Sequence, residues 1–351
     1  MPQRILIIRL SAIGDIVMAS GVIPCLRDAF PDATIAWLTE EGNEDLLRHN
    51  PRLDRVFVWP RRRWRELGRK RHYRQWWLEF RRLQRDLKAQ RFDWVLDLQG
   101  LLKSAVWGWL AGGQRRVGLG SKEGSQLFVT EIVDRNIDSP VIAKEYRNLM
   151  DVLDTLPERY AMDIAVSPQT QRTADTLLRN TGVSGSYAVL CPFTTRPQKH
   201  WFDDRWVELA TGIRDSIGLT PLIVGSAGER DRAAAMAECA GKSAVNLCGQ
   251  TRLDECAAVI RGSSLLVGVD TGLTHLGIAM QRPTLALFGS TCPYLDTGSD
   301  SARVLYHRLP CSPCHRHPTC QGAYTCMRLH SAASVLAATH ELLDAVVDSP
   351  V

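Results

Sequence analysis

The fold is decided by the stretch Val267-Gly268-Val269-Asp270-Thr271-Gly272-Leu273-Thr274-His275-Leu276. An apolar run over 264–269 predicts a buried strand, and a helical pattern begins directly after Asp270-Thr271-Gly272. Asp270 or Thr271 can cap this helix, and Gly272 lets a ligand approach the backbone. Because the first N–H groups of a helix are free and its dipole is positive at that end, the turn favours a phosphate. An ordinary strand-to-helix turn has the same pattern, but His275, one turn into the helix and facing the turn, favours a ligand site.

Length and composition limit the class of protein. A chain of 351 residues suggests two domains of about 150 residues each. The net charge of +5 is small but unevenly placed, which favours a local anionic ligand over nucleic acid bound along a whole face. No segment reaches the roughly 18 uncharged apolar residues of a membrane span, and Arg9 and Asp15 come too early for a signal peptide. We therefore expect a cytoplasmic protein.

The first half of the chain alternates predicted strands and helices. Strand patterns cover 4–9, 33–38, 55–59 and 92–98, and the residues 117–138 are expected to form a loop with one short strand. Pro24 should kink the first helix or make it restart over 22–30.

Two polar turns of this half should meet at one edge of the sheet. Asp15 follows the first strand, and Gln99 and Lys103 follow the strand at 92–98. Because open parallel sheets place their functional loops at the carboxyl ends of strands, these three side chains are expected in one crevice.

The second half repeats the α/β rhythm. Strands are expected at 187–191, 221–224, near 245, at 264–269 and at 284–288, with helices at 204–216, 230–240 and 253–261. We place an N-terminal domain at 1–160, a linker region at 161–186, a C-terminal domain at 187–330 and a C-terminal helix at 331–351. The fold class is therefore α/β, with two Rossmann-like, doubly wound domains.

A cationic arm separates the third and fourth predicted strands. Thirteen basic residues between Arg61 and Arg91 face three acidic ones. Five aromatic residues are interleaved with them: Trp64, Tyr73, Trp76, Trp77 and Phe80. This pattern suits a surface that touches both anions and apolar material, although nucleic acid would also fit and a solvated basic helix is the ordinary alternative.

With these elements in place, the sequence resembles the bacterial ADP-heptose transferases of lipopolysaccharide core assembly, glycosyltransferase family nine, and most nearly the heptosyltransferase I type. The resemblance runs over nearly the whole chain. It is carried by residues 9–15 (RLSAIGD), 40–42 (EEG), 62–65 (RRWR), 97–104 (DLQGLLKS), 194–201 (TTRPQKHW) and 269–276 (VDTGLTHL). It implies the GT-B architecture: an N-terminal acceptor domain, a C-terminal nucleotide-sugar domain, a cleft between them, and no divalent metal needed for transfer.

The resemblance also implies roles for the candidate site residues. The family's general base matches Asp15, an acid in a loop leading into a helix, where capping the helix is the alternative role. A donor ADP-sugar would be bound by Thr194, Thr195, Lys199, Glu229, Asp270, Thr271, Gly272 and His275. Inversion at the anomeric carbon would follow from a single direct displacement.

The acceptor would be the anionic Kdo and lipid A region at the cytoplasmic surface of the inner membrane, to which the protein would be peripheral. Arg62, Arg63 and Arg65 of the cationic arm, with Gln99 and Lys103, would contact it, and Trp64 and Trp76 would supply interfacial contacts. The alternatives are a heptosylated core, a protein acceptor, or a non-catalytic protein that binds nucleotide-sugar or nucleic acid. We expect no nucleic-acid partner.

Four cysteines near the C-terminus form a separate pattern. Two residues separate Cys311 from Cys314, and Cys320 and Cys326 follow after gaps of five residues each. This spacing predicts one structural metal ion, with buried thiols or a disulfide as the alternatives. Simple heptosyltransferase I sequences lack the cluster, whereas heptosyltransferase II types and relatives that modify autotransporters have a similar one. The resemblance therefore makes iron as well as zinc a candidate.

Overall fold

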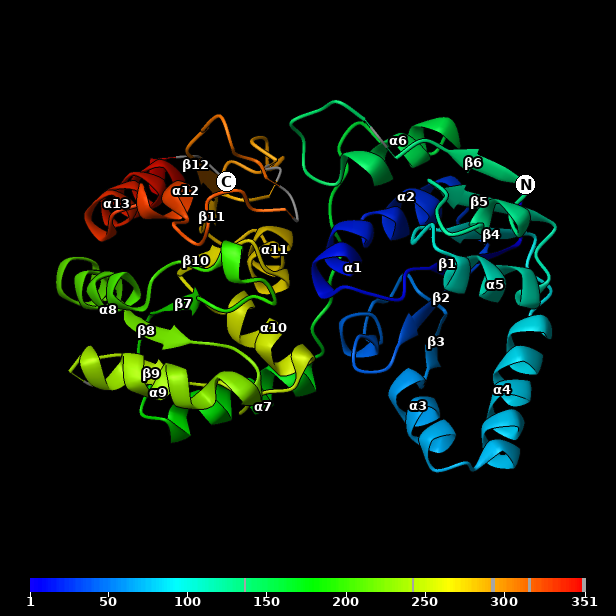
Figure 1. The fold of residues 1–351 in the computed structure, drawn as a ribbon, viewed down its shortest axis with the longest axis horizontal. Coiled ribbons are helices and arrows are strands. Elements are labelled where there is room, and N and C mark those ends of the chain that lie inside the picture. The colour runs from blue at the N-terminus through cyan, green and yellow to red at the C-terminus, as the bar shows by residue number, and fades with distance from the viewer. Residues whose placement is uncertain (136, 242, 292–293, 315–316, 349–351) are drawn as a thin grey trace. The chain divides into compact units, whose positions relative to one another are not determined.

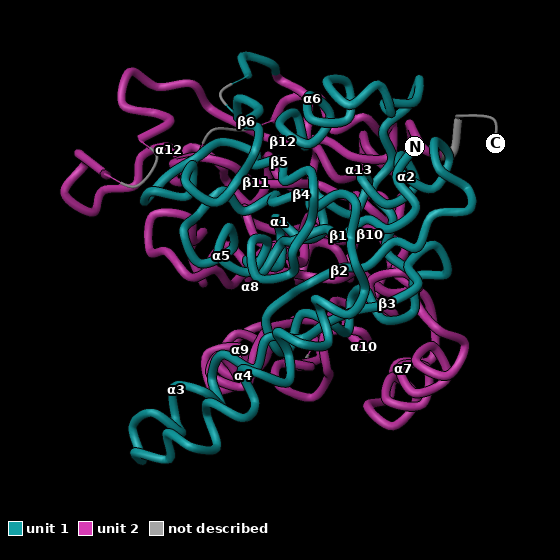
Figure 2. The backbone as a smooth tube through the Cα atoms, turned by 90° about the vertical axis from the view of Figure 1, so that its right-hand side faces the viewer, with its two compact units in different colours: residues 1–139, 143–165 teal, residues 140–142, 166–351 magenta. Residues whose placement is uncertain are grey.

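The computed structural model describes residues 1–135, 137–241, 243–291, 294–314 and 317–348. The chain forms two compact units (Figure 2). Unit 1 contains Met1–Ser139 and Ala143–Ala165, and unit 2 contains Pro140–Ile142 and Val166–Val351.

Unit 1 is built on a parallel six-stranded sheet with the order β3-β2-β1-β4-β5-β6 (Figure 1). Its strands are β1 (Arg4–Ile8), β2 (Thr34–Glu40), β3 (Arg55–Trp59), β4 (Trp94–Asp97), β5 (Arg115–Leu119) and β6 (Glu131–Val133). Its helices are α1 (Ile13–Ala19), α2 (Val22–Ala29), α3 (Arg61–Arg69), α4 (Tyr73–Lys88), α5 (Leu102–Ala111) and α6 (Lys144–Val152), with short 3-10 turns at Glu44–Leu46 and Ser125–Leu127. The central strand β1 is apolar almost throughout because both faces of the sheet are covered.

Unit 2 repeats this design with the order β12-β11-β10-β7-β8-β9. Its strands are β7 (Tyr187–Cys191), β8 (Thr220–Ile223), β9 (Val245–Asn246), β10 (Leu265–Val269), β11 (Thr284–Phe288) and β12 (Ala302–Tyr306). Its helices are α7 (Pro168–Asn180), α8 (Asp203–Gly212), α9 (Arg230–Cys239), α10 (Leu253–Arg261), α11 (Gly272–Ala279), α12 (Thr325–Arg328) and α13 (Ala332–Asp348), with 3-10 turns at Pro197–Lys199 and Ala227–Glu229 and a π turn at Ile213–Ile217. The predicted α/β, doubly wound fold class is confirmed.

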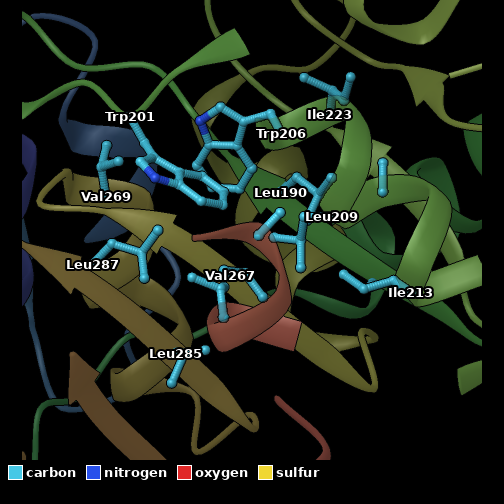
Figure 3. Close-up of a cluster of buried hydrophobic side chains, with 14 of the residues drawn as sticks. Leu190, Trp201, Trp206, Leu209, Ile213, Ile223, Val267, Val269, Leu285 and Leu287 are labelled. Carbon is cyan, nitrogen blue, oxygen red and sulfur yellow. The ribbon is translucent and has the colours of Figure 1, made fainter. Parts of the chain in front are cut away.

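The core of unit 2 fixes how α11 follows β10. Trp201 and Trp206 pack with Val267 and Leu285 in one buried cluster (Figure 3). On the same strand, a Cβ atom at Gly268 would lie 2.1 Å from Thr274 Oγ1. Only glycine therefore lets the first turn of α11 pack directly against β10.

Each sheet contains one topological switch point. Counted within its unit, each sheet has the strand order 3-2-1-4-5-6, so β1 lies beside β4 in unit 1 and β7 lies beside β10 in unit 2. The connections leave these neighbours in opposite directions, which opens a crevice at their carboxyl ends, where ligands of such folds bind. Functional side chains are therefore expected in the loops after β1, β4, β7 and β10.

Two details of unit 1 test the expectations from sequence. The first helix does restart: α1 ends at Ala19, α2 begins at Val22, and Pro24 occupies the first turn of α2, where its missing N–H costs nothing. The expectation of one short strand within 117–138 was wrong, because β5 begins at Arg115 and pairs with β4, and β6 follows it.

The cationic arm folds into two helices, α3 and α4, that project from the sheet as a hairpin (Figure 1). Several of its aromatic residues hold the hairpin together. Trp64 is 6% exposed and packs on Trp107 of α5, and Trp76 stacks on Phe80 with ring centroids 5.6 Å apart. The interfacial role expected for Trp64 is therefore wrong, because its ring is buried. Trp76 is partly buried against the hairpin, and the role expected for it stays a prediction.

A buried carboxylate shapes the loop after β4. Asp97 Oδ1 accepts hydrogen bonds from the backbone N–H groups of Gln99 (3.0 Å) and Gly100 (3.2 Å), and Oδ2 accepts one from Ser104 Oγ (3.0 Å). Burial raises the pKa of Asp97 to about 6, although these hydrogen bonds oppose the shift. Asp97 thus positions Gln99 at the switch point of unit 1.

This raised pKa gives a testable pH dependence. An unfolded Asp titrates near about 3.9, so between about pH 4 and 6 the folded protein holds a proton that the unfolded chain releases. The contribution of protonated Asp97 to the free energy of unfolding is therefore fully present below about pH 4 and is lost as the pH rises through about 6. Relative to Asp97→Asn, the free energy of unfolding of the wild type should fall by up to about 3 kcal/mol between pH 4 and 7. Urea unfolding at each pH measures it, with the exposed Asp32→Asn as charge control, and parallel curves for wild type and Asp97→Asn would contradict the assignment.

Candidate functional site

The loop after β1 presents Asp15 in the first turn of α1. Its Oδ2 accepts a hydrogen bond from Ala12 N (3.2 Å) and lies 2.5 Å from Arg9 Nη2. The side chain is 37% exposed, and no residue in the described part of the chain donates to Oδ1. Asp15 therefore does cap its helix, and it still has one free carboxylate oxygen.

Arg9, which the reasoning from sequence did not single out, ties the two loops of this switch point together. Its side chain is buried, and its Nη1 donates to Leu98 O at 2.6 Å while Nη2 binds Asp15. Gln99 adds a second link, because its Oε1 accepts hydrogen bonds from Leu10 N (3.1 Å) and Ser11 N (3.3 Å). The signal in the sequence was a charged residue at the end of an apolar strand.

Glu40, at the end of β2, gathers two cations beside these loops. Its Oε1 lies 3.0 Å from Lys103 Nζ and 3.0 Å from Arg61 Nη1. Glu40 N also donates to Leu10 O, which joins this group to the loop before Asp15. The structure thus brings together Asp15, Gln99 and Lys103 as expected from the sheet, and it adds Glu40 and Arg61.

The three arginines predicted for the acceptor differ in their surroundings. Arg62 is 84% exposed, with Nε 3.5 Å from Glu41 Oε1. Arg63 donates through Nε (3.0 Å) and Nη2 (2.6 Å) to Glu79 of α4, so its charge is compensated within the hairpin. Arg65 is exposed and forms no ion pair within the described ranges. Arg62 and Arg65 are therefore the two that solvent reaches most directly.

At the switch point of unit 2, the loop after β7 meets the turn after β10. Lys199 Nζ lies 2.6 Å from Asp270 Oδ2, and Thr194 Oγ1 donates to Asp270 O at 3.4 Å. Thr291 Oγ1 also donates to Asp270 Oδ2 at 2.6 Å. Burial raises the pKa of Asp270, but the His275 ring and the Lys199 charge outweigh it and hold the pKa well below its usual range. Asp270 is therefore an ionised acceptor at neutral pH.

The buried ring of His275 contacts the carboxylate of Asp270. The ring is 4% exposed, with Nδ1 2.7 Å from Tyr294 Oη and Nε2 3.5 Å from Asp270 Oδ1. Both ring nitrogens are thus engaged, so the side chain orients the carboxylate and does not face solvent. The pattern one turn into a helix predicted its direction, but nothing in the sequence pointed to Tyr294.

The other predicted donor residues lie around the same edge of the sheet. Thr271 is the N-cap of α11 and Gly272 is its first residue, so the backbone N–H groups there lack intrahelical partners. Thr195 is exposed in the loop after β7. Glu229 follows β8, the strand next to β7, and its Oε2 accepts from Ser226 N at 2.5 Å.

The predicted structural zinc or iron is not supported. Cys311, Cys314, Cys320 and Cys326 do line one small cavity, together with Ser290. In the part of the chain that is described, however, no group of three or more Cys, His, Asp or Glu side chains is arranged to hold a metal ion. Burial and the neighbouring thiols raise the pKa of Cys314 and Cys326, which favours protonated thiols.

No helix in the described ranges is long and apolar enough to cross a bilayer.

Comparisons with known proteins agree with this geometry. A sequence model of "Glycosyltransferase family 9 (heptosyltransferase)" matches residues 80–325. The chain is 30% identical over 301 residues to lipopolysaccharide heptosyltransferase 1 of Escherichia coli K12, covering 84% of this chain and 91% of that protein. It is 31% identical over 322 residues to lipopolysaccharide heptosyltransferase 1 of Pseudomonas aeruginosa PAO1, covering 89% and 86%. The structure of E. coli heptosyltransferase WaaC with ADP-2-deoxy-2-fluoro heptose matches with a TM-score of 0.72 and 26% identity, covering 96% of this chain and 99% of that one.

These matches extend along most of both chains, and the two Rossmann-like sheets are those of GT-B heptosyltransferases. The resemblance stated from the sequence motifs is confirmed. The chain belongs to glycosyltransferase family 9, the heptosyltransferases, and is a glycosyltransferase.

Proposed function

We propose that this protein transfers a heptose from ADP-heptose to the Kdo region of the lipopolysaccharide inner core, with inversion and without a divalent metal. The observation that carries the proposal is Asp15, a carboxylate at the switch point of unit 1 with one oxygen fixed and one free. The relatives named lipopolysaccharide heptosyltransferase 1 and the neighbour solved with an ADP-heptose analogue support the choice of donor and acceptor.

Asp15 acts as the general base. An acceptor hydroxyl oxygen attacks the anomeric carbon, the bond from that carbon to the diphosphate oxygen breaks, and the hydroxyl proton passes to Asp15 Oδ1. Arg9 and Ala12 N hold Oδ2, so the oxygen without a partner is the one available to the hydroxyl. One displacement from the face opposite the diphosphate inverts the configuration.

Unit 2 stabilises the leaving group. ADP leaves as an anion, so a second carboxylic acid like that of glycosidases is unnecessary, and cations and N–H donors take its place. Lys199, Thr194, Thr195 and the N–H groups at Thr271 and Gly272 supply these donors. Asp270 accepts hydrogen bonds from the heptose, with His275 fixing its orientation, and Glu229 accepts them from the ribose.

Unit 1 receives the anionic acceptor at the cytoplasmic surface of the inner membrane. Arg62, Arg65 and Lys103 contact the carboxylates of Kdo and the phosphates of lipid A. Gln99 shapes the adjoining loop through its bonds to the backbone, and Arg63 keeps the hairpin in place through Glu79.

The central experiment identifies the product and the base together. The protein is incubated with ADP-heptose and either Kdo-lipid A or the once-heptosylated core, and the masses of the lipid products are measured by mass spectrometry. One added heptose on Kdo-lipid A is expected, and the rate should fall by about a hundredfold to ten-thousandfold in Asp15→Asn, which keeps the shape but cannot accept the proton.

Asp32→Asn, an exposed carboxylate in the same unit, is the matched control and should keep the wild-type rate. A product only from the once-heptosylated core would reject the proposed acceptor. A rate for Asp15→Asn within a few-fold of the wild type would reject the base.

A reciprocal pair of variants separates the two substrate sites. Lys199→Ala should lower kcat/KM for ADP-heptose by about a hundredfold, because it removes charge that stabilises the leaving group, and His275→Ala should cost less. The double variant Arg62→Glu, Arg65→Glu should raise the acceptor KM by roughly tenfold and spare the donor KM. Steady-state kinetics with each substrate varied in turn measures both effects. The reverse assignment of the two KM changes would refute the proposed sites.

A further inference from the structure

The outer face of α4 has an unusual composition. The outer face of α4 is the side of the helix formed by seven exposed residues: Arg74, Trp77, Leu78, Arg81, Arg82, Arg85 and Lys88. The opposite side of the helix packs into the hairpin through Trp76, Phe80, Leu83 and Leu87. At 3.6 residues per turn these two sets occupy opposite sides of one helix.

The apolar residues of the outer face leave about half of their surface in solvent. Trp77 is 53% exposed and Leu78 is 54% exposed, and Tyr73 at the start of the helix is exposed as well. The guanidinium of Arg81 lies over the Trp77 ring, 5.5 Å from its centroid, a contact that holds the indole at the surface. The helix therefore displays an indole and an aliphatic side chain beside a row of cations.

Most cations of this face are uncompensated, whereas some other cations of the hairpin have a carboxylate partner. Arg63 and Lys70 each contact a carboxylate within 2.6 Å. Among the described residues, Arg74, Arg81, Arg85 and Lys88 form no ion pair, and Arg82 only approaches Asp86 at 3.9 Å. Such a row of like charges repels itself, so an anionic partner would stabilise it.

We propose that the outer face of α4 docks on the anionic surface of a phospholipid bilayer. Trp77 and Leu78 enter the headgroup region, and the arginines contact lipid phosphates, the combination by which interfacial helices bind membranes. Single-stranded nucleic acid would use the charges and stack on Trp77, but it has no use for the exposed Leu78. The inference adds a docking surface to the proposed function and rests on it only for the lipid-linked acceptor, because the binding itself needs neither substrate.

The test is sedimentation of the full-length protein with vesicles, without donor or acceptor. Binding is expected to vesicles of phosphatidylethanolamine and phosphatidylglycerol, to weaken with salt, and to be absent from phosphatidylcholine alone. The triple variant Arg74→Gln, Arg81→Gln, Arg85→Gln should lower the partition coefficient by about fivefold per charge. The double variant Trp77→Ala, Leu78→Ser should lower it by roughly tenfold.

Matched controls keep the test specific. Trp109→Ala on α5 removes an indole of the same exposed fraction, 53%, and Arg172→Gln, Arg179→Gln removes exposed charge from α7. Both controls should bind vesicles as the wild type does. Circular dichroism checks that every variant is folded. If an α4 variant does not fold, the wild type alone is compared on anionic and neutral vesicles, and equal binding to both would contradict the proposal.

The outcomes separate this inference from the proposed function. The α4 variants should transfer heptose to acceptor in detergent micelles at the wild-type rate. Equal binding of wild type and α4 variants, equal binding to neutral vesicles, or binding to an oligonucleotide but not to vesicles would overturn the docking surface. Vesicle binding without transfer would overturn the proposed function and leave the docking surface standing.

Discussion

The structure depends on one constraint, the reversal of strand order at the centre of each sheet. In unit 1, β1 lies beside β4, and in unit 2, β7 lies beside β10, so within each sheet the two loops that leave these strands diverge and expose their polar groups at the carboxyl edge of that sheet. Asp15 and Asp270 each follow one of these strands. The same topology thus places a carboxylate at the switch point of each unit, although the surroundings of the two carboxylates differ.

The difference between the two carboxylates follows from what surrounds them. Asp270 is held on both oxygens, by Lys199 and Thr291 on one and by the His275 ring near the other, so it is a fixed, ionised acceptor. Asp15 is bound only on the side of Arg9 and is partly open to water. A base must exchange a proton with a substrate, whereas a binding carboxylate gains from being held rigid, and the two environments suit these two tasks.

The fold was predictable where burial on both faces gives the sequence a simple pattern. The fully buried strands β7 and β11 match the predicted bounds, because an apolar run between polar turns has few other interpretations. The edge strand β3 and the helix α10 also match the predicted bounds, although neither is buried on all sides. The strand β5 was obscured at its start by two basic residues. Arg115 is compensated by Glu131 of the neighbouring strand at 2.7 Å, and that partner is sixteen residues away along the chain. Local periodicity cannot reveal such a pairing.

In the candidate sites and the cationic arm, too, the sequence pattern did not reveal which residues come into contact. The turn at Asp270 was predictable. Its ion pair with Lys199, however, joins the turn after β10 to the loop after β7, and only the sheet order brings these two segments together. In the arm, the sequence showed aromatic residues among arginines without showing which side of a helix each would occupy. Trp76, one residue before Trp77, is used to pack α4, while Trp77 is left exposed. A helix turns by about 100° per residue, so adjacent residues with the same chemistry can have opposite roles, and the three-dimensional packing decides between them.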